Sequence, residues 1–215
     1  MAISPYVKAL DSVQRQLAVF MRPLGFRKSG RTFNRRVSAD LIQVVNLQMG
    51  QYPIGDYVIP GIRESYYGRF TVNLGVALPV VPLIEFGRKP RAFIQESSCQ
   101  IRTRLSNLVF GEDTWFDLDH SVGHTAAAIV AHMDRAGLPF LEEYESLDAV
   151  LQAINSRGAL PMNNPARSAL VGAMICVHLR RSDQARNYFE RAVDLAADHK
   201  GFIKHVSDVR RRCGI

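Results

Sequence analysis

Five polar side chains in the first half of the chain could together recognise an anionic group. Arg102 and Arg104 lie two residues apart in a stretch of alternating polar and apolar residues, so both point to one face of a strand. By the same alternation, Asn46, Gln48 and Asn73 point to the polar face of two other strands. Two guanidinium groups beside amide groups suit a carboxylate or a phosphate. The sequence therefore predicts a binding site formed by these five residues.

The same residues also fit a second interpretation, in which this face is an ordinary solvated surface of an antiparallel sheet. A solvated face usually carries Lys, Glu and Asp, and the polar positions of these strands carry almost none. In the second interpretation the two arginines point to bulk water or pair with acidic residues of segment 111–160. Both interpretations stay open at this point.

Patterns for catalysis and for metal binding are weak in this sequence. Residues 117–124 (DLDHSVGH) contain His120 and His124 at a helical spacing that suits a metal, but the HExxH pattern is absent. The GxSxG, P-loop and GxGxxG patterns are absent as well, and Cys99 falls on the apolar face of its strand. We therefore expect no metal and no cofactor, and the residues favour a binding protein over an enzyme.

The composition is that of a globular chain of 215 residues, with 47% hydrophobic and 22% charged residues. No apolar run approaches the roughly 18 residues that a membrane span needs, and the first residues lack the pattern of a signal peptide. Three widely spaced cysteines are typical of a reducing compartment. We expect a cytoplasmic protein without a membrane partner.

Charge is distributed unevenly along the chain. Its net charge of +7 combines +9 in residues 1–110, −7 in residues 111–160 and +5 in residues 161–215. The basic first half suits an acidic partner, although the acidic middle segment could instead lie against the basic parts. The run Arg210–Arg212 could add phosphate contacts, but no nucleic-acid-binding motif accompanies it.

The pattern of apolar residues predicts an N-terminal helix and four strands in the first half of the chain. Ser4 and Pro5 begin the helix, whose apolar stripe includes Leu10, Leu17 and Phe20. Period-two segments then predict strands at 31–37, 41–49, 69–78 and 98–108, each with one buried and one wet face. The helix is expected to cover the apolar face, which includes Phe70, Val72, Leu74, Ile101 and Leu105.

Helical periodicity takes over after Trp115. Helices are expected at 122–136 and 147–154, from Pro165 after an Asn164 cap, from a Ser182 or Asp183 cap, and at 202–212. The predicted fold class is therefore α+β: an N-terminal helix packed on a four-stranded antiparallel sheet, followed by an all-helical C-terminal half. The expected domains are 1–116 and 117–215.

The connection 51–68 is long for a compact domain and contains Tyr52, Tyr57, Tyr66 and Tyr67. It leaves the strand that carries Gln48 and returns just before Thr71, so we expect it to border the polar sheet face. Tyrosines at such a rim favour recognition. The alternative is a connection that packs its own aromatic side chains.

The order of these pieces is similar to that of a known family. A helix ending in PLGFRKSGRTF (23–33) precedes VVNLQ (44–48), FTVNLG (70–75) and RTRL (102–105), with Trp115 and Phe116 further on. Over roughly residues 5–135 the chain resembles the DUF4304 family of bacterial proteins, whose function is unknown. The resemblance implies a small cytoplasmic α+β domain, with some members encoded among toxin-immunity genes.

These observations lead to one main hypothesis and two alternatives. The main hypothesis is a non-enzymatic bacterial binding protein, of the immunity type, that recognises an acidic protein partner through the Arg/Asn/Gln sheet face. The first alternative is a small-anion-binding protein or enzyme that uses this face as a pocket. The second is a weak nucleic-acid-binding protein.

Overall fold

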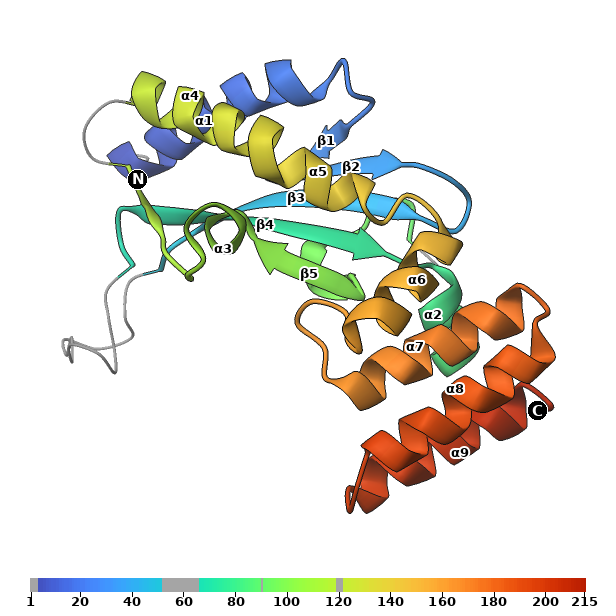
Figure 1. Cartoon of the computed structure of the whole chain (residues 1–215). Helices are drawn as coiled ribbons and strands as arrows, with labels where there is room; N and C mark the ends of the chain where they lie inside the picture. The colour runs from blue at the N-terminus through green and yellow to red at the C-terminus, as the bar shows by residue number, and fades with distance from the viewer. Residues whose placement is uncertain (1–3, 52–65, 90, 119–121) are drawn as a thin grey trace. The chain divides into compact units, whose positions relative to one another are not determined.

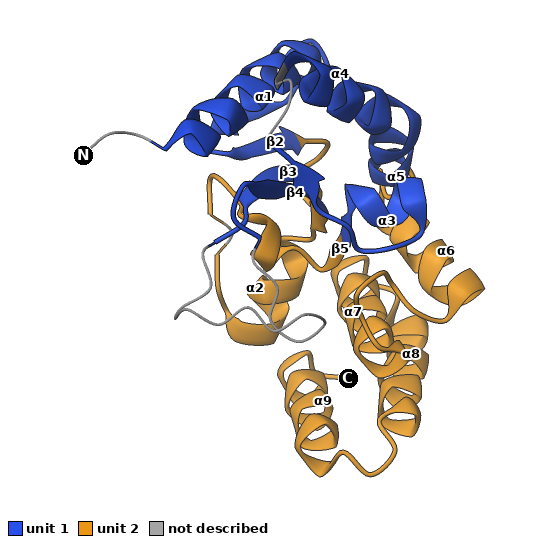
Figure 2. Ribbon diagram, turned by 90° about the vertical axis from the view of Figure 1, so that its left-hand side faces the viewer, with its two compact units in different colours: residues 1–35, 44–74, 103–142 blue, residues 36–43, 75–102, 143–215 orange. Residues whose placement is uncertain are grey.

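The structure is a computed structural model that describes residues 4–51, 66–89, 91–118 and 122–215. The chain divides into two compact units, coloured separately in Figure 2. Unit 1 comprises Met1–Arg35, Val44–Leu74 and Thr103–Glu142, and unit 2 comprises Arg36–Gln43, Gly75–Arg102 and Glu143–Ile215. Each unit thus combines segments from both sides of residue 116, and the proposed domain boundary there stays a prediction.

The strands form an antiparallel sheet with the order β1-β2-β3-β4-β5, in which β6 pairs with β4. Their bounds are β1 Arg27–Ser29, β2 Thr32–Arg36, β3 Ile42–Met49, β4 Arg69–Ala77, β5 Ile101–Arg104 and β6 Phe116–Asp117. The four predicted strands correspond to β2, β3, β4 and β5. The sequence pattern missed β1 and β6 because three and two residues are too short to show a period of two.

Helix α1 (Pro5–Met21) covers the sheet of unit 1, as predicted. Pro5 occupies the first turn, where its missing N–H costs nothing, and Leu10, Val13 and Leu17 on one face are fully buried. Helix α4 (Val122–His132) packs against α1, and the two lie side by side in Figure 1. The π-helical turn η2 (Met133–Gly137) connects α4 to α5 (Leu138–Glu142).

Strand β4 is buried along almost its whole length. Phe70, Val72 and Leu74 have no exposed surface, which confirms the predicted register. The expectation of a wet opposite face is wrong at this strand, because Thr71 is fully buried and Asn73 is only 5% exposed. A central strand that is covered on both faces usually has an apolar sequence. The two buried polar side chains therefore need hydrogen-bond partners to offset the cost of their burial.

The predicted strand 98–108 is shorter in the structure. Ser98 ends a short 3₁₀ turn, η1 (Glu96–Ser98), and β5 covers only Ile101–Arg104. Leu105 instead begins helix α3 (Leu105–Phe110), which ends at Gly111 with φ +76°. A glycine in this left-handed conformation commonly ends a helix. The residues before Gly111 therefore form a helix, although the alternation of polar and apolar residues continues through Leu105.

Unit 2 contains most of the C-terminal helices. They are α6 Leu147–Arg157, α7 Pro165–His178, α8 Ser182–Leu195 and α9 Lys200–Arg212, and the unit also contains the earlier helix α2 (Val80–Phe86). The buried helix α7 packs against α2, α6 and α8, and α9 packs against α2 and α8. The helical C-terminal half is thus confirmed. Among the described residues, no helix is long and apolar enough to cross a membrane.

Candidate functional site

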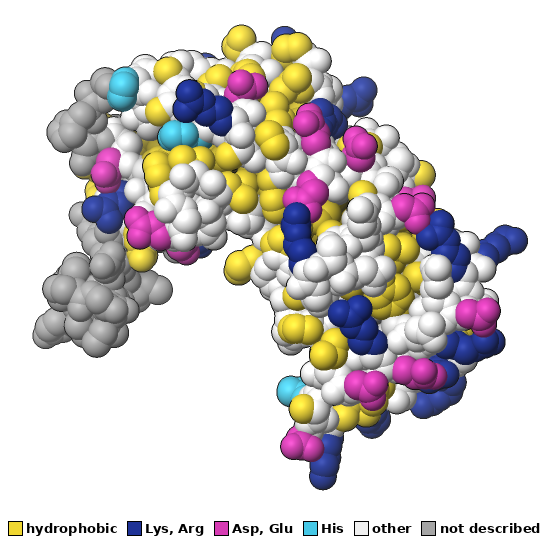
Figure 3. All heavy atoms as spheres, in the orientation of Figure 1, with side chains coloured by type: hydrophobic (Ala, Val, Ile, Leu, Met, Phe, Trp, Pro, Cys, Tyr) yellow, Lys and Arg dark blue, Asp and Glu magenta, His cyan; other side chains and the backbone are white. Residues whose placement is uncertain are grey.

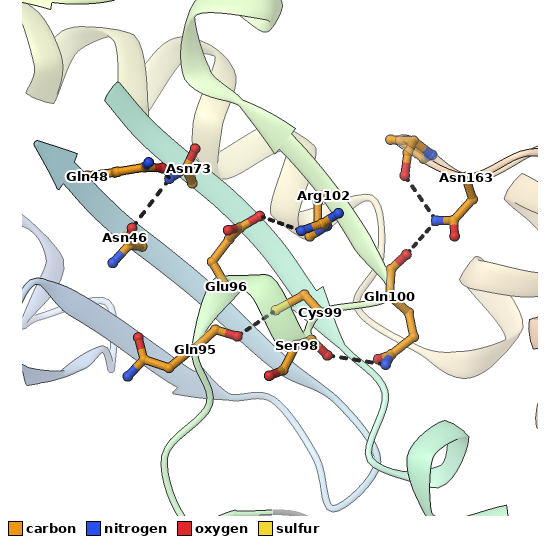
Figure 4. A network of polar contacts seen from close by, with 11 residues as sticks. Asn46, Gln48, Asn73, Gln95, Glu96, Ser98, Cys99, Gln100, Arg102 and Asn163 are labelled. Carbon is orange, nitrogen blue, oxygen red and sulfur yellow. Dashed lines mark hydrogen bonds and ion pairs between the residues drawn. The ribbon is translucent and has the colours of Figure 1, made fainter. Parts of the chain in front are cut away.

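Three of the five predicted site residues form a hydrogen-bonded ladder across β2, β3 and β4 in unit 1. The Asn73 Nδ2 donates to Gln48 Oε1 at 3.0 Å and to Asn46 Oδ1 at 3.3 Å (Figure 4). The Asn46 Nδ2 in turn donates to Thr32 Oγ1 at 2.9 Å. The ladder satisfies the amide of the buried Asn73, so these side chains bind one another and stabilise the sheet.

Arg104, at the end of β5 in unit 1, already has a carboxylate partner. Its Nη1 lies 2.6 Å from Asp113 Oδ1, and its guanidinium lies 5.3 Å from the ring centre of Trp115. Asp113 belongs to the acidic segment 111–160, as the second interpretation of the sequence anticipated. The positive charge of Arg104 is therefore largely compensated before any ligand arrives.

Arg102 belongs to unit 2 and also faces a carboxylate. Its Nη1 lies 3.8 Å from Glu96 Oε1, a contact drawn in Figure 4. Neither predicted arginine is thus an uncompensated cation. The structure brings together Asn46, Gln48 and Asn73 and gives Arg102 and Arg104 separate acidic partners.

The predicted rim loop lies mostly outside the described residues, including Tyr52 and Tyr57. Tyr66 and Tyr67 are described, and both contact aromatic side chains of unit 1. Tyr66 stacks on Trp115 with 4.6 Å between ring centres, and Tyr67 meets Tyr6 edge-on at 4.9 Å. These contacts are those of aromatic packing.

The cysteine thiols are poor nucleophiles, and the described residues contain no metal cluster. Burial raises the pKa of all three cysteine thiols, to about 11 for Cys176, and so disfavours the reactive thiolate. Within the described ranges, no group of three His, Cys, Asp or Glu side chains could hold a metal ion. In the segment 117–124, Asp117 pairs with Arg69 at 2.9 Å, and His120 lies outside the described residues.

The C-terminal arginines of α9 are engaged within unit 2. Arg210 pairs with Glu190 at 3.7 Å, Arg211 pairs with Asp208 at 2.9 Å, and Arg212 donates to the Asp208 carbonyl. Figure 3 shows basic and acidic side chains interspersed over the C-terminal helices. A surface of alternating charge is a weak platform for a polyanion, which disfavours a nucleic-acid site on this helix.

Unit 1 instead presents an uncompensated basic groove between the C-terminal half of α1 and strand β1. We call it the α1–β1 groove; its volume is about 840 Å³. It is lined by Ala18, Val19, Arg22, Gly25, Phe26, Arg27, Lys28 and Phe33. Its three charged residues are all cations, and Val19 is 77% exposed beside them. The groove thus combines positive charge with accessible apolar surface.

Local structure fixes the shape of this groove. Gly25, at φ +87°, turns the chain from α1 into β1, a conformation that glycine adopts without strain. The Arg35 guanidinium lies 4.9 Å from the ring centre of Phe26 and holds this ring at the groove floor. The side chain of Gln14 on α1 donates to the Gly30 carbonyl, which fixes the β1–β2 turn.

The sequence contained a signal for this groove that the strand pattern did not reveal. Residues 1–35 carry seven Lys and Arg but only one acidic residue, Asp11. Asp11 pairs with Arg31 at 3.5 Å, and within the described residues no carboxylate pairs with Arg22, Arg27 or Lys28. The cations flank the turn at Gly25, so counting charges across the connection from α1 to β1 would have found the groove.

Fold and site together define an α+β protein whose helix-covered antiparallel sheet carries a basic groove at one edge strand. The profile of a domain of unknown function, DUF4304, matches residues 17–143, more than half of the chain. The chain therefore belongs to the DUF4304 family, and the resemblance seen in the sequence is confirmed. Comparison with curated proteins and with solved structures gave no match. Helices α6 to α9 follow the matched region.

Proposed function

We propose that this chain is a non-enzymatic binding protein that recognises an acidic segment of a protein partner through the α1–β1 groove. One observation carries the proposal: every charged residue that lines the groove is a cation, and none pairs with a carboxylate within the described residues. Charge complementarity of this kind guides association and selects partners. The proposal keeps the acidic partner expected from the sequence and replaces the surface that binds it.

The backbone of β1 supports an extended partner segment. Strand β1 is the edge of the sheet, and Arg27, Lys28 and Ser29 are all exposed. Ser29 pairs with Thr32 across a two-residue turn, so by antiparallel alternation the N–H and C=O of Lys28 point away from β2. A partner strand could therefore pair with Lys28 while its acidic side chains meet the groove cations.

The test is fluorescence anisotropy with a labelled peptide of about eight alternating Glu and Val residues. The intact chain should bind it, and the triple variant Arg22→Gln/Arg27→Gln/Lys28→Gln should bind at least about tenfold more weakly. The matched control removes three other exposed cations of unit 1: Lys8→Gln, Arg15→Gln and Arg135→Gln. It should retain affinity within about twofold.

Equal weakening by both triple variants would show that only net charge matters, which contradicts the groove. A single-stranded oligonucleotide that binds more tightly than the peptide would favour the nucleic-acid alternative. An immunity-type role, in the cytoplasm of a bacterium, is the specific form of this function that the family resemblance suggests. Binding of a toxin encoded next to this gene, abolished by the groove variant, would establish it.

A further inference from the structure

Unit 2 contains a separate cavity of about 350 Å³, formed by the end of β4, helix α2 and the segment that leads to β5. This volume lies within the range of pockets for small molecules. Pro82 and Phe86 supply accessible apolar surface, and Phe86 is 52% exposed. The charged lining residues are Glu85, Arg88, Lys89, Arg91 and Arg167.

Glu85 is the acidic residue of this lining, and its charge is neutralised within the unit. Its carboxylate, only 2% exposed, accepts hydrogen bonds from both Nη atoms of Arg167, with 2.7 Å between Nη2 and Oε2. The His205 Nε2 lies 2.7 Å from Glu85 Oε1. Two of the five N–H groups of Arg167 are used in this pair, and the other three can serve a ligand.

Three cations on the segment after α2 have no such acidic partner. Arg88, Lys89 and Arg91 are exposed, and within the described ranges no carboxylate pairs with any of them. The Arg88 guanidinium lies 5.1 Å from the ring centre of Phe86, which orients it by a cation–π contact. By contrast, Arg157, Arg181 and Arg186 of the same unit each pair with a carboxylate.

We propose that this cavity binds a small phosphate monoester with a compact apolar body. A phosphate monoester carries between about −1.5 and −2 charges at pH 7, which suits three uncompensated cations better than a single carboxylate does. Arginine guanidinium groups bind phosphate oxygens in pairs, and Lys89 adds a point charge. The apolar body of the ligand lies against Pro82 and Phe86.

The experiment is isothermal titration of the full chain with phenyl phosphate, inorganic phosphate and benzoate. We expect phenyl phosphate to bind most tightly, because only this probe combines a dianion with an apolar body. The variant Arg88→Ala/Lys89→Ala should weaken phenyl phosphate binding by about tenfold or more. The control variant Lys200→Ala/Lys204→Ala removes two cations of α9 from the same unit and should bind like the intact chain.

Benzoate binding as tight as that of phenyl phosphate would overturn the preference for phosphate. The cavity would be overturned as the site if phenyl phosphate gave no heat and no thermal stabilisation, or if both double variants lost affinity equally. The acidic-peptide function is tested on other residues, in unit 1. The variant Arg88→Ala/Lys89→Ala should still bind the acidic peptide. The peptide proposal and the phosphate proposal can therefore fail independently of each other.

Discussion

Arg167 on α7 binds both carboxylate oxygens of Glu85 on α2, and Glu85 is almost completely buried. His205 on α9 contacts the same carboxylate. One side chain of the family-matched region thereby connects two helices that follow it in sequence. Because a buried ion loses its hydration, the carboxylate is tolerated only with these partners in place.

The first prediction concerns the stability contributed by Glu85. Glu85→Ala leaves Arg167 without its partner in a partly buried position and should cost about 3–5 kcal/mol in urea unfolding. The matched control, Glu190→Ala, removes the exposed partner of Arg210 in the same unit and should cost less than about 1 kcal/mol. Similar losses in the two variants would contradict a special role for the Glu85 pair.

The second prediction concerns pH. Burial raises the pKa of Glu85, but hydrogen bonds and charge from Arg167 and then His205 outweigh it, so the pKa lies below its ordinary value of 4.5. A carboxyl group whose pKa is lower in the folded chain than in the unfolded chain stabilises the fold at any pH above its unfolded pKa. This stabilisation is lost as the pH falls through the folded pKa. The stability difference between the intact chain and Glu85→Gln should therefore shrink as the pH falls below about 4.5.

Urea unfolding of both proteins between about pH 3 and pH 7 measures this difference directly. Other carboxyl groups with lowered pKa values, such as Asp148, are common to both proteins and cancel. A difference that stayed constant through the acidic range would mean that the charge of Glu85 does not contribute.

Much of the core followed from the sequence, because burial of one face constrains every second residue of a strand and one stripe of a helix. Leu10, Leu17, Phe70 and Leu74 are buried as predicted, whereas Phe20 is only half-buried because it lies at the border of its stripe.

The residues that cap the helices were harder to predict from the sequence. Asn164 caps α7 as expected, with Oδ1 accepting from the Arg167 N–H at 2.7 Å. The predicted cap of α8 at Ser182 or Asp183 is wrong, because Arg181 occupies that position without a side-chain cap.

The candidate sites were less predictable, because spacing fixes which face a side chain lies on but not which partner it finds. The partner of Arg104 is Asp113, nine residues further on and beyond a helix that the strand pattern concealed. The α1–β1 groove depends on the turn at Gly25 and on a strand of three residues. Neither feature has a periodic signature in the sequence.

The third prediction concerns Thr71, whose buried Oγ1 has no hydrogen-bond partner within the part of the chain that the structure describes. Thr71→Val preserves the shape and removes an unsatisfied hydroxyl, so stability should stay the same or increase by about 1 kcal/mol. The control is Thr32→Val on β2, which is separated from β4 by β3. Thr32 Oγ1 accepts from Asn46, so this variant should lose about 1–3 kcal/mol. Destabilisation of equal size in both would show that Thr71 has a partner after all.

The fourth prediction concerns thiol reactivity. Cys99 and Cys176 are buried, and Cys213 is partly exposed on the C-terminal side of α9. Burial raises the pKa of each thiol, so alkylation of the folded chain at pH 8 should be slow and largely confined to Cys213. Peptide mass spectrometry after iodoacetamide treatment measures the order in which the three cysteines are alkylated. The urea-unfolded chain is the control. Early labelling of Cys99 would contradict its burial in unit 2.

The last prediction concerns Arg104, which links the acidic partner Asp113 to the ring of Trp115. The side chains of Arg104 and Asp113 are 30% and 54% exposed, so solvent screens their attraction. A double-mutant cycle with Arg104→Ala and Asp113→Ala should therefore give a coupling below about 1 kcal/mol. The double variant Arg102→Ala/Arg104→Ala should likewise leave the chain folded. The Arg102 Nη1 lies 3.8 Å from Glu96 Oε1, and so long an ion pair contributes little to stability.

The chain has a single tryptophan, so fluorescence reports on Arg104 directly. Removing the guanidinium 5.3 Å from the ring centre of Trp115 takes a cation from the indole face and should shift its emission. The control is Arg69→Ala, which breaks another exposed ion pair of unit 1, with Asp117, and should leave the emission unchanged. A coupling of several kcal/mol would identify the Arg104–Asp113 pair as a structural anchor for the segment after α3. An unchanged emission in Arg104→Ala would instead show that the guanidinium does not lie over the ring.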